Sequence, residues 1–183
     1  MFCLFICLFS HKSPFVIGDF YGDNRTMIAV SAISEQVALT WQAGVLRVFD
    51  LAGLEGDLLF RNVDFEATIQ GGERNGHFSW GLSASSNSLW VSEPYFGNYR
   101  AEEKAATGRL YEYTFGTSFP TGTVRDRAEA ASTCLTGREV RGRFGQHVVT
   151  LDLDGDGHED LVTTSVHSSS GAAHSGLVSV FFG

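Results

Sequence analysis

The chain has 183 residues, of which 43% are hydrophobic and 19% charged, so it is long enough and apolar enough to form a folded domain. Its formal net charge is −8, and a surface of this sign disfavours nucleic acid and anionic membranes as partners. Glycine and phenylalanine are abundant, at 21 and 15 residues. This composition favours short strands joined by tight turns over helices.

The chain begins with an apolar run, residues 1–9, which contains Cys3 and Cys7. The run is too short to span a bilayer. Three interpretations stay open for residues 1–14: a signal peptide, a buried strand, or a misjudged gene start. A signal peptide would lack the usual basic residue before the apolar run and a clear cleavage site after it. An odd count of three cysteines predicts no disulfide framework. If the apolar start is cleaved, Cys134 is left alone, and we interpret it as structural.

Three segments further along share one strand pattern. Each begins with a glycine and then alternates β-forming residues with others, which is the side-chain period of a strand. The segments are residues 44–49, 108–113 and 176–181. Their glycines are 64 and 68 residues apart. The spacing indicates an internal repeat of about 65 residues.

Other features recur within the same repeat. A second predicted strand lies upstream of each segment, at residues 27–32, 89–94 and 161–166. In two repeats an aromatic residue followed by glycine lies further upstream, at residues 78–81 and 144–145.

A repeat of this length fits a four-stranded propeller blade with long loops. We therefore predict an all-β fold, with about three blades of a β-propeller. Propellers have about 4–8 blades, so the ring would be incomplete. The predicted divisions are an apolar start at 1–14 and three repeats, at 15–70, 71–137 and 138–183.

The third repeat contains an acidic loop at residues 152–160. Counted from Asp152, carboxylates occupy positions 1, 3, 5 and 9 (Asp152, Asp154, Asp156 and Asp160). His158 at position 7 can offer its backbone carbonyl. Calcium prefers six to eight oxygen ligands, and carboxylates this close repel one another without a cation. The spacing predicts a calcium site.

Two alternatives compete with this prediction. An EF-hand loop needs a glutamate at position 12 and flanking helices, but Thr163 stands at position 12 and the flanks have strand patterns. The loop could also be a solvated acidic turn without a metal.

The matching loops of the other two repeats are predicted not to bind calcium. In the first repeat Asp19 and Asp23 occupy positions 1 and 5, but Tyr21 and Met27 occupy positions 3 and 9. Methionine is a poor ligand for a hard cation. In the second repeat, residues 83–88 contain no carboxylate.

These motifs resemble the FG-GAP repeat of integrin α-subunit propellers over roughly residues 15–183. The resemblance rests on Phe144 and Gly145, on the acidic loop, and on residues 92–94 at the expected GAP position. It implies blades of an integrin α-type propeller with calcium in the acidic loop.

Within that superfamily, residues 63–69, 76–83 and 108–115 look most like the propeller region of the glycosylphosphatidylinositol-specific phospholipase D family. That resemblance implies a secreted accessory propeller beside a separate, N-terminal zinc-dependent hydrolase domain, which matches nothing in this chain. The expected partners are calcium, the remaining blades and an upstream catalytic domain. The alternative function is that of an integrin-like adhesion propeller.

No catalytic site is predicted within the chain itself. The six histidines do not cluster at metal-ligand spacing, and there is no nucleophile elbow, phosphate loop or dinucleotide fingerprint. Neither a nucleic-acid partner nor a membrane-spanning segment is expected. A glycosylation sequon at residues 24–26 has meaning only if the protein is secreted, and an extracellular location is the expectation.

Overall fold

The computed structural model describes residues 14–52, 65–97, 105–116, 119–125, 127–173 and 175–183. The prediction for the apolar start falls almost wholly on residues 1–13, which lie outside the described residues. Within the described part of the chain the regular structure consists of strands, and no helix there is long and apolar enough to cross a membrane.

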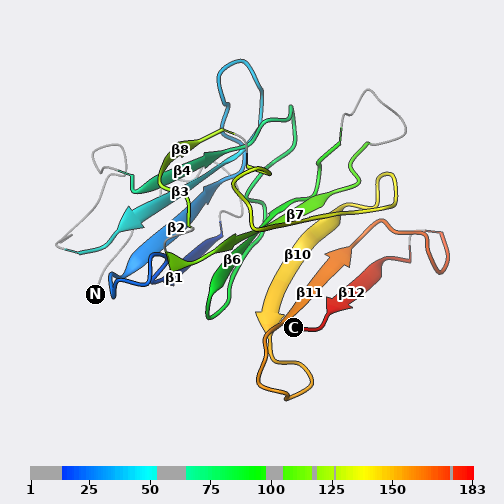
Figure 1. Cartoon of the computed structure of the whole chain (residues 1–183). Coiled ribbons are helices and arrows are strands. Elements are labelled where there is room, and N and C mark those ends of the chain that lie inside the picture. Colours follow the sequence, from blue (N-terminus) through cyan, green and yellow to red (C-terminus); the bar gives the residue numbers. More distant parts are fainter. Residues whose placement is uncertain (1–13, 53–64, 98–104, 117–118, 126, 174) are drawn as a thin grey trace, which may run out of the picture.

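Twelve short strands follow one another along the chain (Figure 1). They are β1 (Phe15–Gly18), β2 (Met27–Ala32), β3 (Val45–Asp50), β4 (Ala67–Gln70), β5 (Leu82–Ala84), β6 (Ser88–Glu93), β7 (Arg109–Thr114), β8 (Gly122–Val124), β9 (Thr133–Thr136), β10 (Phe144–Leu151), β11 (Asp160–Ser165) and β12 (Leu177–Phe181).

The strands form three sheets that follow one another in chain order across the molecule (Figure 1). The first sheet has the order β1-β2-β3-β4-β8, the second β5-β6-β7-β9, and the third β10-β11-β12. Neighbouring strands are antiparallel except for β4 and β8, which are parallel. The described strands do not close into a ring. The prediction of an all-β fold with an incomplete ring is confirmed.

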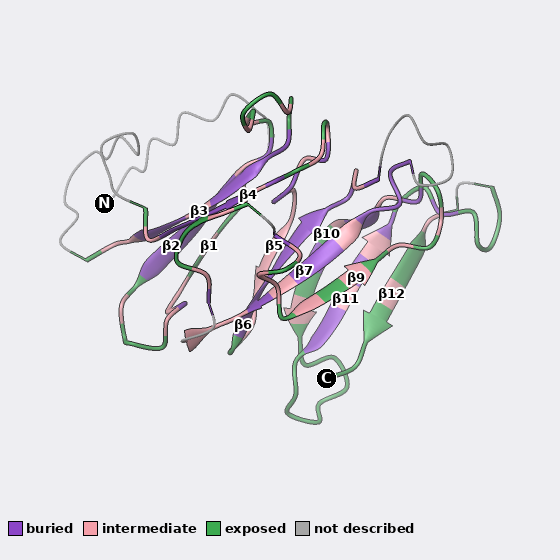
Figure 2. Ribbon diagram, turned by 45° about the horizontal axis from the view of Figure 1, so that its top comes forward, coloured by how far each residue is buried: buried purple, intermediate pink, exposed green. Residues whose placement is uncertain are grey.

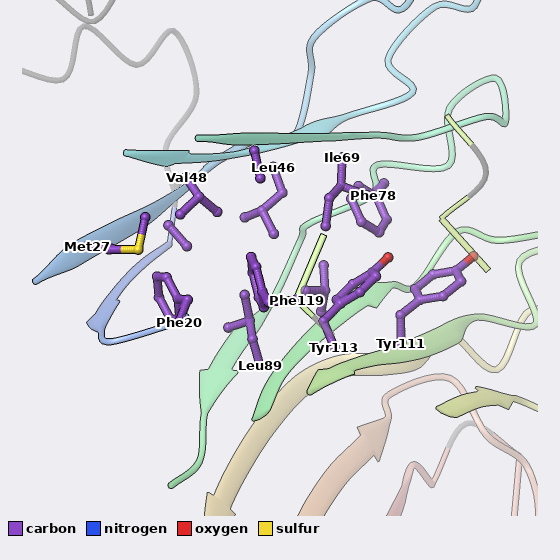
Figure 3. Packing of buried hydrophobic residues seen from close by; sticks show 13 residues of the cluster. Phe20, Met27, Leu46, Val48, Ile69, Phe78, Leu89, Tyr111, Tyr113 and Phe119 are labelled. Carbon is purple, nitrogen blue, oxygen red and sulfur yellow. The ribbon is translucent and has the colours of Figure 1, made fainter. Parts of the chain in front are cut away.

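The hydrophobic core lies between consecutive sheets. The larger cluster joins the first sheet to the second, and Figure 3 shows Leu46 and Ile69 of the first sheet directed toward Leu89 and Tyr111 of the second. A smaller cluster joins the second sheet to the third, through residues that include Trp90. Strand β6 lies between both clusters, and all six of its residues are buried. Burying each large apolar side chain contributes about 1.5–3 kcal/mol, so stacking of the sheets is the main source of stability.

The junctions between consecutive repeats are built alike. The N–H of Phe78 donates to the carbonyl of Ala43 at 2.9 Å, and the N–H of Phe144 donates to the carbonyl of Thr107 at 3.0 Å. Gly44 and Gly108, which follow these carbonyls, have φ values of 82° and 86°, in the left-handed region that glycine adopts readily. The backbone of the aromatic residue in one repeat is therefore hydrogen-bonded to the glycine turn of the repeat before it.

Candidate metal centre

The acidic loop connects β10 to β11 at one end of the third sheet. Leu151 at the end of β10 pairs with Asp160 at the start of β11, so residues 152–159 form the tip of a hairpin. Strong β-formers in both strands hold the two ends of the loop together. The hairpin keeps the acidic residues in one small volume.

Three of the predicted ligands lie together. Asp152, Asp154 and Asp156 are exposed, and each offers a carboxylate oxygen that lies within 4.8 Å of the other two. Calcium binds its oxygen ligands at about 2.3–2.6 Å, so ligands on opposite sides of the ion are separated by up to about 5 Å. The donor atoms are all oxygen, which a hard cation prefers. The spacing and the donor type both fit calcium.

Backbone hydrogen bonds fix the conformation of the loop. The N–H groups of Gly155 and Gly157 donate to the two carboxylate oxygens of Asp152, at 2.7 and 3.0 Å. The two glycines have φ values of 82° and 92°, which side-chain-bearing residues rarely adopt. The N–H of His158 donates to Oδ1 of Asp156 at 2.8 Å. The loop is therefore folded back upon its own carboxylates.

The fourth predicted carboxylate lies apart from these three. Asp160 is only 1% exposed, and its oxygens accept hydrogen bonds from the N–H groups of Leu153 at 2.8 Å and Gly183 at 3.0 Å. Asp160 thus ties the base of the loop to the segment after β12. The group of three does not include the carboxylate of Asp160, and the roles of Asp160 and of the His158 backbone carbonyl as ligands stay predictions.

A turn with the same pattern of backbone hydrogen bonds recurs in the first repeat, where an arginine side chain supplies positive charge. Asp19 accepts hydrogen bonds from the N–H groups of Gly22 and Asn24, at 2.8 and 2.7 Å. Arg25 of this loop forms ion pairs with Asp23 at 2.7 Å, Asp50 at 3.1 Å and Glu66 at 3.0 Å, and the last two of these carboxylates lie outside the loop.

The ion pairs of Arg25 are a feature of the first loop that the sequence analysis missed. Arg25 stands at position 7 of the degenerate loop, where His158 stands in the third repeat. That substitution is the only sequence signal for its role.

The acid groups of the two loops differ in their electrostatic partners. Desolvation raises the pKa of Asp19, but hydrogen bonds from the backbone amides of Asn24, Asp23 and Gly22 outweigh it and hold this pKa below its usual value. Within the described residues, no lysine or arginine forms an ion pair with Asp152, Asp154 or Asp156, whereas Arg25 supplies positive charge to the first loop.

The acidic loop also contacts the second repeat. The N–H of Ser86 donates to Oε2 of Glu159 at 2.6 Å. Ser86 lies in the serine-rich segment 83–88, which includes the turn between β5 and β6 and contains no carboxylate of its own. The acidic loop and the matching turn of the preceding repeat are therefore directly linked.

A buried ion pair lies elsewhere, in the second repeat. Glu93 is fully buried, and its carboxylate accepts hydrogen bonds from Nε and Nη2 of Arg127, both at 2.9 Å, and from the hydroxyl of Tyr111 at 2.7 Å. Burial raises the pKa of Glu93, and Arg127 and Tyr111 oppose that rise. Because Arg127 and Tyr111 donate hydrogen bonds to both carboxylate oxygens of Glu93, we interpret this group as structural.

Comparison with known proteins supports the assignment of the third repeat. The FG-GAP repeat family matches residues 144–181, which span β10 to β12 and include the acidic loop. No curated protein shows a significant match to the chain. The chain therefore contains an FG-GAP repeat, and that repeat carries three exposed carboxylates at metal-binding distance.

Proposed function

We propose that residues 152–160 bind one calcium ion and that this ion stabilises the third sheet. The observation that supports this proposal is the group formed by Asp152, Asp154 and Asp156, whose oxygens lie within 4.8 Å of one another. The first repeat supports it by contrast, because Arg25 of that loop pairs with Asp23, the counterpart of Asp156. Among the described residues the third loop has no such arginine, and calcium from solution would supply the positive charge there.

The role of this calcium is structural. The loop closes the hairpin of β10 and β11, and Asp160 at its base holds Gly183 beyond the end of β12. Glu159 holds Ser86 of the second repeat. An ion that fixes the loop would therefore strengthen the third sheet and its attachment to the second. A ligand that binds only the folded state, at a hundredfold excess over its Kd, stabilises that state by about 2.7 kcal/mol.

We further infer that the chain is a non-catalytic, propeller-type segment of a glycosylphosphatidylinositol-specific phospholipase D-like protein, in which catalysis resides in another domain. The support for this parent is the resemblance of residues 63–69, 76–83 and 108–115 to that family. We also propose an extracellular location for this parent protein. Extracellular modules bind calcium with a Kd of about 0.1–1 mM, and we expect an affinity in that range for this loop.

Calorimetric titration with calcium tests the metal site. We expect one site in the wild-type chain, loss of that site in Asp156→Asn, and an unchanged site in Asp23→Asn. Asp23 is the matched control, because it occupies position 5 of the first loop as Asp156 does of the third. Equal calcium binding by the wild type and Asp156→Asn would refute the proposal.

The accessory role has a separate test. The purified, metal-loaded chain is expected not to release a glycosylphosphatidylinositol-anchored reporter from vesicles. Release of the reporter by this chain alone would contradict the inference that catalysis resides elsewhere.

A further inference from the structure

The sequence contains a single Asn-X-Ser/Thr sequon, formed by Asn24, Arg25 and Thr26. This triplet is the acceptor of N-linked oligosaccharides in secreted proteins, provided that the middle residue is not proline. The other asparagines lack a serine or threonine two residues further on, and they are Asn62, Asn75, Asn87 and Asn98. An N-linked glycan on this chain therefore has one acceptor position.

The structure places this sequon on the surface. Residues 19–26 form the loop that joins β1 to β2, and both Asn24 and Thr26 are exposed there. Strand β2 begins at the next residue, Met27, and is almost wholly buried, as its colour in Figure 2 shows. The acceptor amide and the hydroxyl residue therefore lie on the solvent side of the point where the chain enters the first sheet.

The backbone directs the Asn24 side chain away from the protein. Asn24 has a φ of 66°, which asparagine tolerates better than most residues, and its N–H donates to Oδ2 of Asp19 at 2.7 Å. Gly157 holds the same position in the acidic loop, with a φ of 92° and its N–H donating to Oδ2 of Asp152 at 3.0 Å. Apart from its chain neighbours, a Cβ atom added to Gly157 would meet no atom within 4 Å. The matching conformation indicates that a side chain at this position extends into solvent.

The acceptor amide is not engaged by its surroundings. Within the described residues, the side chain of Asn24 forms no hydrogen bond. The neighbouring Arg25 side chain instead pairs with Asp50 of β3 at 3.1 Å and with Glu66 at 3.0 Å. The middle residue of the sequon is thus directed to the first sheet, and the amide nitrogen of Asn24 is accessible to a glycosylating enzyme.

We propose that Asn24 is an N-glycosylation site, which takes an oligosaccharide from a lipid diphosphate donor. The inference rests on the extracellular location proposed above, because this modification belongs to secreted proteins. In the transfer, Nδ2 of Asn24 forms a bond to C1 of the first sugar, and the bond between C1 and the diphosphate oxygen breaks. The lipid diphosphate leaves, and the amide nitrogen releases one proton.

The glycan is compatible with the fold of the first loop. It is attached at Nδ2, so the backbone hydrogen bond of Asn24 to Asp19 and the ion pairs of Arg25 are retained. The glycine at the matching position of the acidic loop, Gly157, offers no acceptor. We therefore expect the bulky, solubilising sugar on the first repeat alone, with calcium binding to the acidic loop unchanged.

Cell-free translation with microsomes tests the site. The full chain is given a cleavable signal peptide and a carboxy-terminal tag with a sequon of its own, and electrophoresis before and after digestion with peptide N-glycosidase counts the glycans on protease-protected chains. We expect two glycans on the wild type and on Thr26→Ser, but only the glycan of the tag on Asn24→Gln and Thr26→Ala. Because this transfer accompanies synthesis of the chain, the count does not depend on whether a variant folds.

Asn87→Gln is the matched control, since Asn87 is exposed in the turn between β5 and β6 but Leu89 stands where a sequon needs serine or threonine. It should carry two glycans, as the wild type does. A wild type with the glycan of the tag alone, or an Asn24→Gln variant that keeps both glycans, would overturn the proposal. The added signal peptide makes this result independent of the proposed location, which a natural protein found only in the cytosol would contradict.

A second measurement tests the placement of the glycan. Peptide N-glycosidase should release it from the folded chain without denaturant, because Asn24 is exposed. In water enriched in oxygen-18 the released site becomes a labelled aspartate, which mass spectrometry is expected to locate at position 24. Circular dichroism establishes that the chain stays folded. A label at another position, or a glycan released only after unfolding, would overturn the assignment of this exposed loop as the glycosylation site.

Discussion

The carbonyl oxygen of Phe144 lies 2.0 Å from the point that a Cβ atom on Gly108 would occupy. Gly44 stands in the same relation to Phe78, at 2.2 Å. In both cases the neighbour is backbone, which cannot rotate away. The junction between consecutive repeats therefore depends on the absence of a side chain at one position.

Gly108→Ala is expected to lower the free energy of unfolding by more than about 3 kcal/mol, because a steric clash adds to backbone strain. Gly155→Ala is the matched control, since its φ of 82° is similar but no atom lies within 4 Å of the added Cβ. The free energy of unfolding of Gly155→Ala should fall by about 1–2 kcal/mol, which is the cost of placing alanine in the left-handed conformation. Urea denaturation measures both, and equal losses would show that the junction does not depend on close approach.

Removal of calcium is expected to destabilise the wild-type chain and to leave Asp156→Asn unaffected. With calcium at a hundredfold excess over its Kd, the melting temperature should rise by about 5–10 °C relative to chelator. Because protons compete with the metal for carboxylates, this difference should shrink as the pH falls. Thermal melts with calcium and with chelator measure the effect, and a melting temperature indifferent to chelator would argue for a solvated acidic turn.

Substitution of Arg25 by glutamine is expected to lower the melting temperature in the presence and in the absence of calcium alike. The variant leaves Asp23, Asp50 and Glu66 without their shared cation. Arg25→Lys should retain part of the stability, because lysine keeps the charge but not the planar array of donors. High salt should narrow the differences by screening the charges. A calcium-dependent effect of Arg25→Gln would show that the two loops are coupled.

Arg127→Met is expected to cost about 3–5 kcal/mol at neutral pH, because it leaves the buried carboxylate of Glu93 without its partner. Burial raises the pKa of Glu93 in the folded state above its value in the unfolded chain. Stability from such a group is present at low pH and is lost as the pH rises through the folded-state pKa.

The Arg127→Met variant should therefore recover stability, relative to the wild type, as the pH falls and Glu93 becomes protonated. Replacing both residues by methionine should restore much of the lost stability at neutral pH. Urea titrations across the pH range provide the measurement, and a loss that does not change with pH would exclude a buried charge as the cause.

The strands of the repeat could be predicted closely from the sequence. The segment 27–32 coincides with β2, while 89–94 and 161–166 each lie one residue from β6 and β11. These strands are detectable because β-forming residues recur in the same order after similar intervals. Strand β8 was not predicted, because it has three residues and pairs with β4 across a long stretch of chain. So short a segment carries no periodic signal.

The candidate site could be predicted only in part. The spacing of Asp152, Asp154 and Asp156 predicted that their carboxylates lie close together, and the structure places their oxygens within 4.8 Å of one another. The sequence did not reveal the bonds of Asp160 to Leu153 and Gly183, because they depend on where β12 ends in space. For the same reason the partners of Arg25 were missed, since Asp50 and Glu66 reach it from other parts of the chain.

The positive charge of the first loop cannot diffuse away, since Arg25 is part of the chain. A calcium ion in the third loop would exchange with the surrounding solution. One molecule therefore contains two hairpins of similar shape, of which one serves as an internal standard for the other. A fluorescent label on the first loop would register temperature and solvent alone, and the same label on the third loop would register the calcium concentration as well.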